Sequence, residues 1–489
     1  MSKEFTEILA SVRDSSSIGE IERLKEEVGL CRRRVGFGGS HSVAIYPPFA
    51  ALRENASLEP YDVAGGLEEP LELNLYIHNP FCEWLCHFCN YSIKDENLSP
   101  KLENKMVEAI GAEIQHWKEC FDDVGRKPML RSVYIGGGTG LILSYDSLEY
   151  LMETLMGESF SVGDPFHLCI ESSSSALCRQ DARAKLRLLK GYGLDRISIG
   201  VQTLDEEILR ILARGKSRED KYIETLKQGP KTAVDIADCA VAIARDHTEN
   251  INVDLMQELA EDYSDSTLER DLEWFISCEP SSLTLYVTRY SPGSKAYSLF
   301  TSPSEATPEF TYKSVSRRMA VQERLRLVGY IDEPGGRFVK QGTHDIYKES
   351  RCTPDGRLLG VGCSAYSRMG QHFFQNNCEL STWLKRVNQT GSGIACQYFV
   401  TDTELAEGQL INLLRHGGAI TQFRECLPKT SNETEFERNI EQLLNTGILQ
   451  EQDNSYKLTP LGRALEEEIV LLFYSEKNQQ HLANMYRRP

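Results

Sequence analysis

Residues 81–89 read Phe81-Cys82-Glu83-Trp84-Leu85-Cys86-His87-Phe88-Cys89. Three thiolates at this C-x3-C-x2-C spacing can each bind one iron of a [4Fe-4S] cluster, and the fourth iron is then open to an exchangeable ligand. A structural zinc site is the main alternative, but it needs four ligands and only His87 lies near enough to be the fourth. A disulfide framework would need an oxidising compartment. The spacing therefore favours an iron–sulfur cluster.

The residues before this loop predict the element that carries it. Residues 71–78 alternate apolar and polar side chains, from Leu71 to His78, as a half-buried strand does. The cysteine loop is therefore expected to follow the carboxyl end of a strand.

Strands and helices alternate along the next two hundred residues. Predicted strands cover residues 71–78, 131–135, 166–171, 196–202, 251–255 and 283–287, and predicted helices cover 102–117, 148–156, 181–190, 205–214 and 268–276. Such alternation predicts an α/β fold with a parallel sheet, curved or closed, whose site lies at the carboxyl ends of the strands.

Residues that could bind a ligand or take part in a reaction follow several of these predicted strands. They are the three cysteines, Gly136-Gly137-Gly138-Thr139, Glu171, Gln202 and Asp254. The glycine run has two explanations: a tight turn that needs positive φ, or a backbone that a ligand approaches closely. Its place after a strand and before a helix favours a ligand.

Composition limits the classes of function. The chain has 489 residues, 40% of them hydrophobic, so more than one domain and a large core are expected. A formal net charge of −18 disfavours nucleic acid and anionic membranes as partners. No apolar run reaches the about 18 residues that cross a membrane, and the first residues lack a signal-peptide pattern. We therefore expect a cytoplasmic monomer with a small-molecule substrate. Most of the 14 cysteines of the chain are expected to be reduced, buried side chains.

Four motifs now carry a family resemblance. They are Tyr76-Ile77-His78-Asn79-Pro80-Phe81-Cys82 through Cys89, Gly136-Gly137-Gly138-Thr139, Arg196-Ile197-Ser198-Ile199-Gly200-Val201-Gln202 and Val253-Asp254-Leu255. In this order they resemble the radical S-adenosylmethionine (SAM) proteins related to oxygen-independent coproporphyrinogen III oxidase. A later stretch, Leu359 to Ser367, resembles the Gly-x-Gly-x-x-Ala-x-Ser segment of these proteins. The resemblance implies a partial (β/α)6 radical SAM barrel.

The resemblance also assigns cofactors. It implies that Cys82, Cys86 and Cys89 hold a [4Fe-4S] cluster, that two SAM molecules share the site, and that a flavodoxin or ferredoxin supplies electrons. The positions matching the family's SAM contacts are Tyr76, Phe88, Gly137, Gly138, Thr139, Glu171, Gln202, Arg214 and Asp254. Arg214 can pair with a carboxylate. At the end of a helix, its positive charge can instead interact favourably with the helix dipole.

Departures from the family pattern suggest a branch within it. Tyr91 stands where coproporphyrinogen oxidases carry another cysteine, and Gly140 replaces a usual proline. Glu258-Leu259-Ala260 stands where Gly-Leu-Pro is usual, and His344-Asp345-Ile346-Tyr347-Lys348 replaces the His-Asn-x-x-Tyr-Trp segment of the haem chaperones. The chain also has about 75 residues before Tyr76-Ile77-His78, whereas the haem chaperones begin almost directly at this segment. These changes favour the class C radical SAM methyltransferases.

The function expected from this branch is transfer of a methyl or methylene group from a second SAM to an sp2 carbon. C-methylation or cyclopropanation in a natural-product pathway would result. Asp254, Tyr286 and Arg289 are the candidate catalytic residues near the second SAM, although Tyr286 can equally be a core strand residue. Two alternatives remain: coproporphyrinogen oxidation or another tetrapyrrole reaction, and a haem chaperone.

Four domains are expected along the chain. They are an N-terminal extension (1–70), the barrel (71–300), a post-barrel segment (301–400) and a winged-helix-like C-terminal domain (401–489). Amphipathic helices at 405–414, 436–444 and 461–472 and a hairpin around Asp453-Asn454 suggest the last. Because residues 401–489 hold 9 Lys and Arg against 14 Asp and Glu, we expect a lid or specificity domain there rather than a DNA-binding one.

Overall fold

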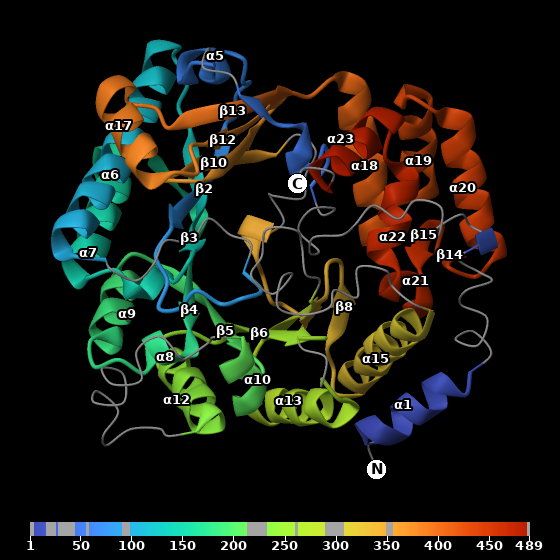
Figure 1. The fold of residues 1–489 in the computed structure, drawn as a ribbon. Helices are drawn as coiled ribbons and strands as arrows, with labels where there is room; N and C mark the ends of the chain where they lie inside the picture. The colour runs from blue at the N-terminus through green and yellow to red at the C-terminus, as the bar shows by residue number, and fades with distance from the viewer. Residues whose placement is uncertain are drawn as a thin grey trace.

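The computed structural model describes residues 4–15, 26–27, 45–54, 58–89, 98–212, 232–259, 263–288, 308–348 and 356–486. A curved sheet occupies the middle of the molecule, helices line its outer side, and a C-terminal helical unit lies across from them (Figure 1). The predicted α/β fold with a parallel sheet and a C-terminal helical part is confirmed.

Parallel strands form the centre of the sheet. They are β2 (Glu72–Asn79), β3 (Met129–Gly137), β4 (Ser161–Ser173), β5 (Leu194–Gln202), β6 (Asn250–Gln257) and β7 (Ser282–Val287), side by side in chain order. Their register aligns the carboxyl ends: His78 pairs with Gly136, and Gly200 pairs with Asp254. The predicted site residues therefore share one edge of the sheet.

Helices connect these strands and cover one face. They are α6 (Pro100–Asp123), α7 (Tyr145–Thr154), α8 (Ser174–Leu177), α9 (Ala182–Gly191), α10 (Glu206–Ile211), α12 (Ala233–Arg245) and α13 (Asp265–Cys278). Side-chain oxygens cap the first turns of all of these helices except α9, as when Ser99 accepts from the Leu102 amide at the start of α6. Alternate strand residues such as Leu75 and Ile77 are fully buried against Ile110 and its neighbours, so the main core lies between sheet and helices.

The sheet continues beyond the predicted barrel on both sides. Beside β2 come β10 (Arg357–Val361), β11 (Tyr366–Met369), β12 (His372–Asn376), β13 (Ile394–Phe399) and β1 (Arg53–Glu54); beside β7 come β9 (Arg337–Val339) and β8 (Ile331–Glu333). β10 is parallel to β2, and the others are antiparallel to their neighbours. The helices α15 (Pro308–Leu327) and α17 (Leu380–Thr390) belong to the same post-barrel region.

The C-terminal unit has an apolar core of its own. It contains α18 (Asp402–His416), α19 (Ile420–Cys426), α20 (Glu433–Asn445), β14 (Leu449–Gln452), β15 (Ser455–Leu458), α21 (Pro460–Ala464), α22 (Glu466–Val470) and α23 (Glu476–Tyr486). The predicted helix 461–472 is instead divided, because Leu465 leaves helical geometry with ψ of 9°. The domain boundaries themselves stay a prediction.

The N-terminal segments pack on distant parts of the fold. Helix α1 (Phe5–Arg13) lies against α15, and α5 (Pro60–Gly65) lies against α6. No helix in the described ranges is both long and apolar enough to cross a membrane.

Candidate functional site

The cysteine loop leaves the end of β2 and is pinned to the loop that follows β3. Asn79 Nδ2 donates to the carbonyl oxygen of Thr139 (2.8 Å), and the Phe81 amide donates to Asn79 Oδ1 (3.2 Å). Cys82 Sγ lies 3.2 Å from Thr139 Oγ1. The first predicted cluster ligand therefore sits directly against the predicted glycine-threonine run.

The glycine run fits around the cysteine loop without room for side chains. A Cβ at Gly138 would lie 2.1 Å from the carbonyl oxygen of Phe81, and one at Gly137 would lie 2.5 Å from the His78 ring. Gly137 also has φ of 100°, as the turn explanation requires. In addition, the Thr139 amide donates to Phe81 O (2.9 Å). These glycines thus hold the cysteine loop in place, a use that the sequence did not reveal.

A buried carboxylate anchors the other side of the loop. Glu83 is 6% exposed and accepts from Arg179 (2.6 Å) and Ser175 (2.6 Å), both beyond the end of β4, and from Ser173. Sequence reasoning missed Glu83, although it lies between two predicted ligands. Since its partners come from β4 and α8, this contact fixes the loop over the neighbouring strand ends.

The three cysteines suit an iron–sulfur cluster better than a single metal ion. Cys86 is buried, whereas Cys82 and Cys89 are partly exposed. Within the described ranges, no three His, Cys, Asp or Glu side chains converge as ligands of one ion. A cluster does not need such convergence, because each thiolate binds a different iron.

Glu171 is held firmly at the end of β4. Its Oε1 accepts from the Tyr134 hydroxyl (2.6 Å) and its Oε2 accepts from the Gly137 amide (2.8 Å). The carboxylate thus links β4 to β3 beside the cysteine loop. Tyr134 is a second residue that the sequence analysis did not select.

Tyr76 is buried near this position and pairs with a histidine. Its hydroxyl lies 2.7 Å from His78 Nδ1, and burial lowers the pKa of His78 to about 4. The imidazole is therefore neutral at physiological pH. Among the described residues, His78 Nε2 is buried without a hydrogen-bond partner, as expected where a polar ligand binds at this edge.

Asp254 lies further along the same edge, on β6. It accepts from Asn252 Nδ2 (2.8 Å) and Ser198 Oγ (3.3 Å), and burial raises its pKa to about 6. Gln202 ends β5 with φ of 73°, a left-handed conformation that is uncommon for such a residue. Both residues are partly exposed, so they can still reach a ligand.

The remaining predicted residues are more scattered. Tyr286 is partly exposed on β7, where it pairs with Met256, and Phe88 packs against the main core. Arg214 and Arg289 lie outside the described residues. The structure thus brings together the cysteines, Gly137 to Thr139 and Glu171, with Tyr76 next to them; the roles of all these residues stay predictions.

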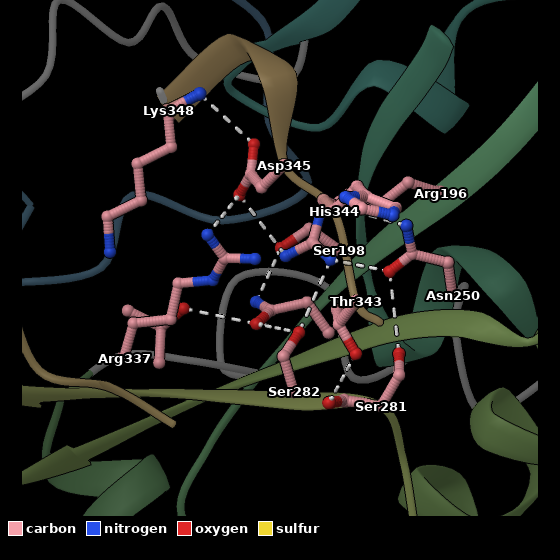
Figure 2. A network of polar contacts seen from close by, with 12 residues as sticks. Arg196, Ser198, Asn250, Ser281, Ser282, Arg337, Thr343, His344, Asp345 and Lys348 are labelled. Atoms are coloured by element: carbon pink, nitrogen blue, oxygen red, sulfur yellow. Dashed lines mark hydrogen bonds and ion pairs between the residues drawn. The ribbon is translucent and has the colours of Figure 1, made fainter. Parts of the chain in front are cut away.

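A polar network occupies the opposite end of the strands (Figure 2). Arg196 donates to Asn250 Oδ1 (2.7 Å) and pairs with Asp345 (3.3 Å between Nη2 and Oδ2). Arg337 also approaches Asp345 (3.8 Å). This network closes the amino ends of the barrel strands and leaves the carboxyl edge for ligands.

A known protein family matches the part of the chain that carries the cysteine loop and the glycine run. The radical SAM superfamily matches residues 76–236, which include the cysteine loop and the glycine run. The chain contains a radical SAM domain. This domain implies a [4Fe-4S] cluster and SAM, and the three cysteines with their flanking edge fit both.

Proteins with similar sequences are found in bacteria. The haem chaperone HemW of Bacillus subtilis is 24% identical, and the alignment covers 82% of this chain and 99% of HemW. The oxygen-independent coproporphyrinogen III oxidase of Salmonella typhimurium is 25% identical over 66% of this chain and 67% of the oxidase. The coproporphyrinogen III oxidase HemN of Escherichia coli has a similar fold, with a TM-score of 0.69 at 20% identity, covering 88% and 96% of the two chains.

These relatives overturn the predicted branch. The methyltransferase and cyclopropanase hypothesis is wrong, because the proteins that match along the chain are named as haem chaperones and coproporphyrinogen oxidases. Two departures that suggested it have structural causes. A Cβ at Gly140 would lie 2.9 Å from the Ile170 side chain, so packing explains this glycine. Glu258 pairs with Arg317 (2.7 Å). Tyr91, another of the departures, lies outside the described residues.

Proposed function

We propose that this chain is a radical SAM enzyme that acts on a tetrapyrrole. One observation carries the proposal: the cysteine loop is fixed on the strand edge that holds Glu171, Gln202 and Asp254, in a chain whose relatives are named for haem and coproporphyrinogen. Cys82, Cys86 and Cys89 would hold the cluster. When bound, a reduced cluster with SAM supplies radical chemistry that abstracts hydrogen from a substrate.

The residues of the chain would position SAM and exclude water. Glu171 accepts hydrogen bonds from Tyr134 and from the Gly137 amide, so its carboxylate is held in a fixed orientation from which it would accept from an amino group or a ribose hydroxyl. The hydroxyl of Tyr76, which lies 2.7 Å from His78 Nδ1, would contact SAM from the same edge. Such prior orientation lowers the entropic cost of the reaction.

We also propose that the site takes two SAM molecules and receives electrons from a flavodoxin or ferredoxin. Gln202 and Asp254 would contact the second SAM, because they lie one and two strands beyond Glu171 on the same edge. Equilibrium dialysis of the cluster-loaded protein should then give two bound SAM per chain. One bound SAM per chain would reject the proposed second SAM molecule and leave the proposal of the first unchanged.

A haem chaperone is the second candidate function. It is favoured by the alignment with HemW, which spans 99% of that protein. The sequence alignment with the coproporphyrinogen III oxidase of Salmonella typhimurium covers less, 66% of this chain and 67% of the oxidase. We place the enzyme first because the cysteine loop and the strand edge beside it suit a cluster with SAM, and turnover decides between the two.

Anaerobic turnover separates the two candidates. The reconstituted protein would be incubated with SAM and reductant, with coproporphyrinogen III, with haem or with neither, and 5′-deoxyadenosine would be quantified. The enzyme proposal predicts that coproporphyrinogen III increases 5′-deoxyadenosine well above the background of the protein alone, and that Cys86→Ala abolishes the increase. Stoichiometric haem binding without SAM cleavage would instead identify a chaperone.

A further inference from the structure

A short segment after the barrel strands, residues 343–348, crosses the amino ends of the sheet (Figure 2). Thr343 Oγ1 donates to the carbonyl oxygen of Ser281 (3.2 Å), directly before β7. Asn250 Nδ2, at the start of β6, donates to the carbonyl oxygen of His344 (3.0 Å). We call residues 343–348 the floor segment, because it covers the end of the sheet opposite to the cysteine loop.

Asp345 anchors the floor segment inside the barrel. It is 9% exposed, and its Oδ2 pairs with Arg196 of β5 (3.3 Å) and Arg337 of β9 (3.8 Å). Its Oδ1 accepts from the amide of Lys348 (3.1 Å). Although burial raises the pKa of Asp345, Arg196 and Arg337 hold it below its usual value. The anchor is therefore an ionised carboxylate at neutral pH.

Tyr347 projects from this anchor onto two tyrosines of the barrel. Its ring stacks on that of Tyr134, with centroids 4.1 Å apart and planes at 26°, and on that of Tyr76, at 5.4 Å and 27°. Tyr76 and Tyr134 are paired neighbours on β2 and β3. The floor segment thus determines where the rings of both tyrosines can lie.

Both barrel tyrosines point their hydroxyls towards the carboxyl edge. The Tyr134 hydroxyl donates to Glu171 Oε1 (2.6 Å), and Glu171 lies two residues beyond Cys169, the register partner of Tyr134. Likewise, the Tyr76 hydroxyl contacts His78, two residues further along β2 (2.7 Å). A continuous chain of contacts therefore runs from Asp345 through Tyr347 and Tyr134 to Glu171.

We propose that Tyr347, held by Asp345, is a positioning residue for Glu171: it fixes the ring of Tyr134, whose hydroxyl orients the carboxylate that contacts SAM. This inference rests on the SAM site of the proposed function. Tyr347 touches no reacting atom in this account, so its effect must pass through Tyr134. A side chain that only filled the core would show no such dependence.

SAM affinity of the cluster-reconstituted protein tests the inference without any tetrapyrrole or turnover. A stacked aromatic pair contributes about 0.5–1.5 kcal/mol, so Tyr347→Leu should weaken SAM binding by about threefold to tenfold. Tyr347→Phe keeps the ring and should stay within about twofold of the wild type. Tyr134→Phe, which removes the hydroxyl but keeps the stack, should also weaken binding.

The double variant Tyr134→Phe/Tyr347→Leu provides the decisive readout. If Tyr347 acts through Tyr134, the double variant should bind SAM no more weakly than the weaker single variant, because both remove the same restraint. Iron and sulfide content should equal that of the wild type in every variant. These two results together would exclude a general loss of structure.

Two outcomes would overturn the inference: wild-type SAM affinity in Tyr347→Leu, or fully additive losses in the double variant. If Tyr347→Leu does not fold, Asp345→Asn carries the test, since it keeps the shape and removes the charge; unchanged SAM affinity there would also overturn it. Failure of the wild type to bind SAM is a different result. It would reject the proposed function itself.

Discussion

Glu258 shows how a single residue can depart from a family pattern for structural reasons. Glu258 directly follows β6 and has φ of 61°, a left-handed backbone conformation that favours glycine. Arg317 of α15 donates to both of its carboxylate oxygens (2.8 and 2.7 Å) and also to Asp265 Oδ1 (2.7 Å). Losing a buried ion-pair partner costs about 3–5 kcal/mol, whereas left-handed strain costs about 1–3 kcal/mol. The ion pair outweighs the strain.

Restoring glycine at this position should therefore destabilise the protein. We expect Glu258→Gly to lower the free energy of unfolding by about 2 kcal/mol, measured by urea denaturation. Glu279→Gly is the matched control, because Glu279 also has positive φ (50°) but is exposed at the end of α13. The control should be neutral or stabilising by about 0.5–1 kcal/mol. Stabilisation by both substitutions would contradict this account of Glu258.

Glu113 of α6 gives a second prediction at the residue scale. Its carboxylate is fully buried and accepts from the amides of Gly362 (2.8 Å) and Gly393 (2.9 Å) and from Asn376 Nδ2 (2.8 Å). All of these partners are N–H donors. The hydroxyl oxygen of a protonated carboxyl group can still accept from them, whereas the amide nitrogen of glutamine cannot. Glu113→Gln should therefore destabilise the fold by about 1–3 kcal/mol, as seen in the midpoint of chemical unfolding.

The pH dependence of this effect has a definite sign. Burial raises the pKa of Glu113 to about 7, whereas the usual value is 4.5. The fold therefore prefers the protonated acid, and the contribution of this group is complete below pH 4.5 and declines as the pH rises to about 7. The stability of the wild type relative to Glu113→Gln should fall across that window. A difference independent of pH would show that Glu113 titrates normally.

Residue identities at the site were predictable only in part. Spacing predicted that Cys82, Cys86 and Cys89 share one loop at the strand edge, and their role as cluster ligands stays a prediction. Glu83 and Arg179, in contrast, are 96 residues apart, and no local pattern reveals a contact between them.

At the scale of elements, the cysteine loop and the glycine run behave as one unit. Gly138 has no room for a Cβ beside the carbonyl oxygen of Phe81 (2.1 Å), and backbone there cannot move aside without displacing Cys82. Gly138→Ala should therefore reduce iron and sulfide content after reconstitution to well under half of the wild-type value. Gly191→Ala is the control, since a Cβ at Gly191 meets no atom within 4 Å. Full cluster content in Gly138→Ala would refute this coupling.

The parallel strands were predictable because each contains a short apolar or alternating run and most are separated by helical patterns. The strands beyond the barrel were not. They are short, and some lie at the margin of the sheet: β8 covers only Ile331–Glu333, and Ile331 is 54% exposed. The helix expected at 461–472 failed for a related reason, since apolar periodicity continues through the break at Leu465.

At the scale of the whole molecule, one buried carboxylate joins the C-terminal unit to the sheet. Glu466 Oε1 accepts from Arg415 (2.6 Å) and its Oε2 accepts from Arg463 (2.9 Å). The amide of Gly335, in the turn between β8 and β9, donates to both of these carboxylate oxygens (3.2 and 3.3 Å). This charged carboxylate therefore contributes to the attachment of the unit, beside the apolar contacts of α15 with its core. No sequence pattern indicated the contact, because Gly335 and Glu466 are 131 residues apart.

Acid should weaken this attachment. Although burial raises the pKa of Glu466, Arg415 and Arg463 lower it overall to about 2, from a usual value of 4.5. Its contribution to stability is therefore complete above pH 4.5 and is lost as the pH falls towards 2. Glu466→Gln should make the C-terminal unit more sensitive to limited proteolysis at neutral pH, with Glu468→Gln as a partly buried control on the same helix. Equal digestion of the two variants would contradict this role.

The central claim is that the protein uses its cluster and SAM to abstract hydrogen from a tetrapyrrole. The most direct test is anaerobic turnover of the reconstituted enzyme with deuterated coproporphyrinogen III, followed by mass spectrometry of 5′-deoxyadenosine. The account predicts deuterium in 5′-deoxyadenosine and a matching change in the mass of the tetrapyrrole. Undeuterated 5′-deoxyadenosine with an unchanged tetrapyrrole would contradict it.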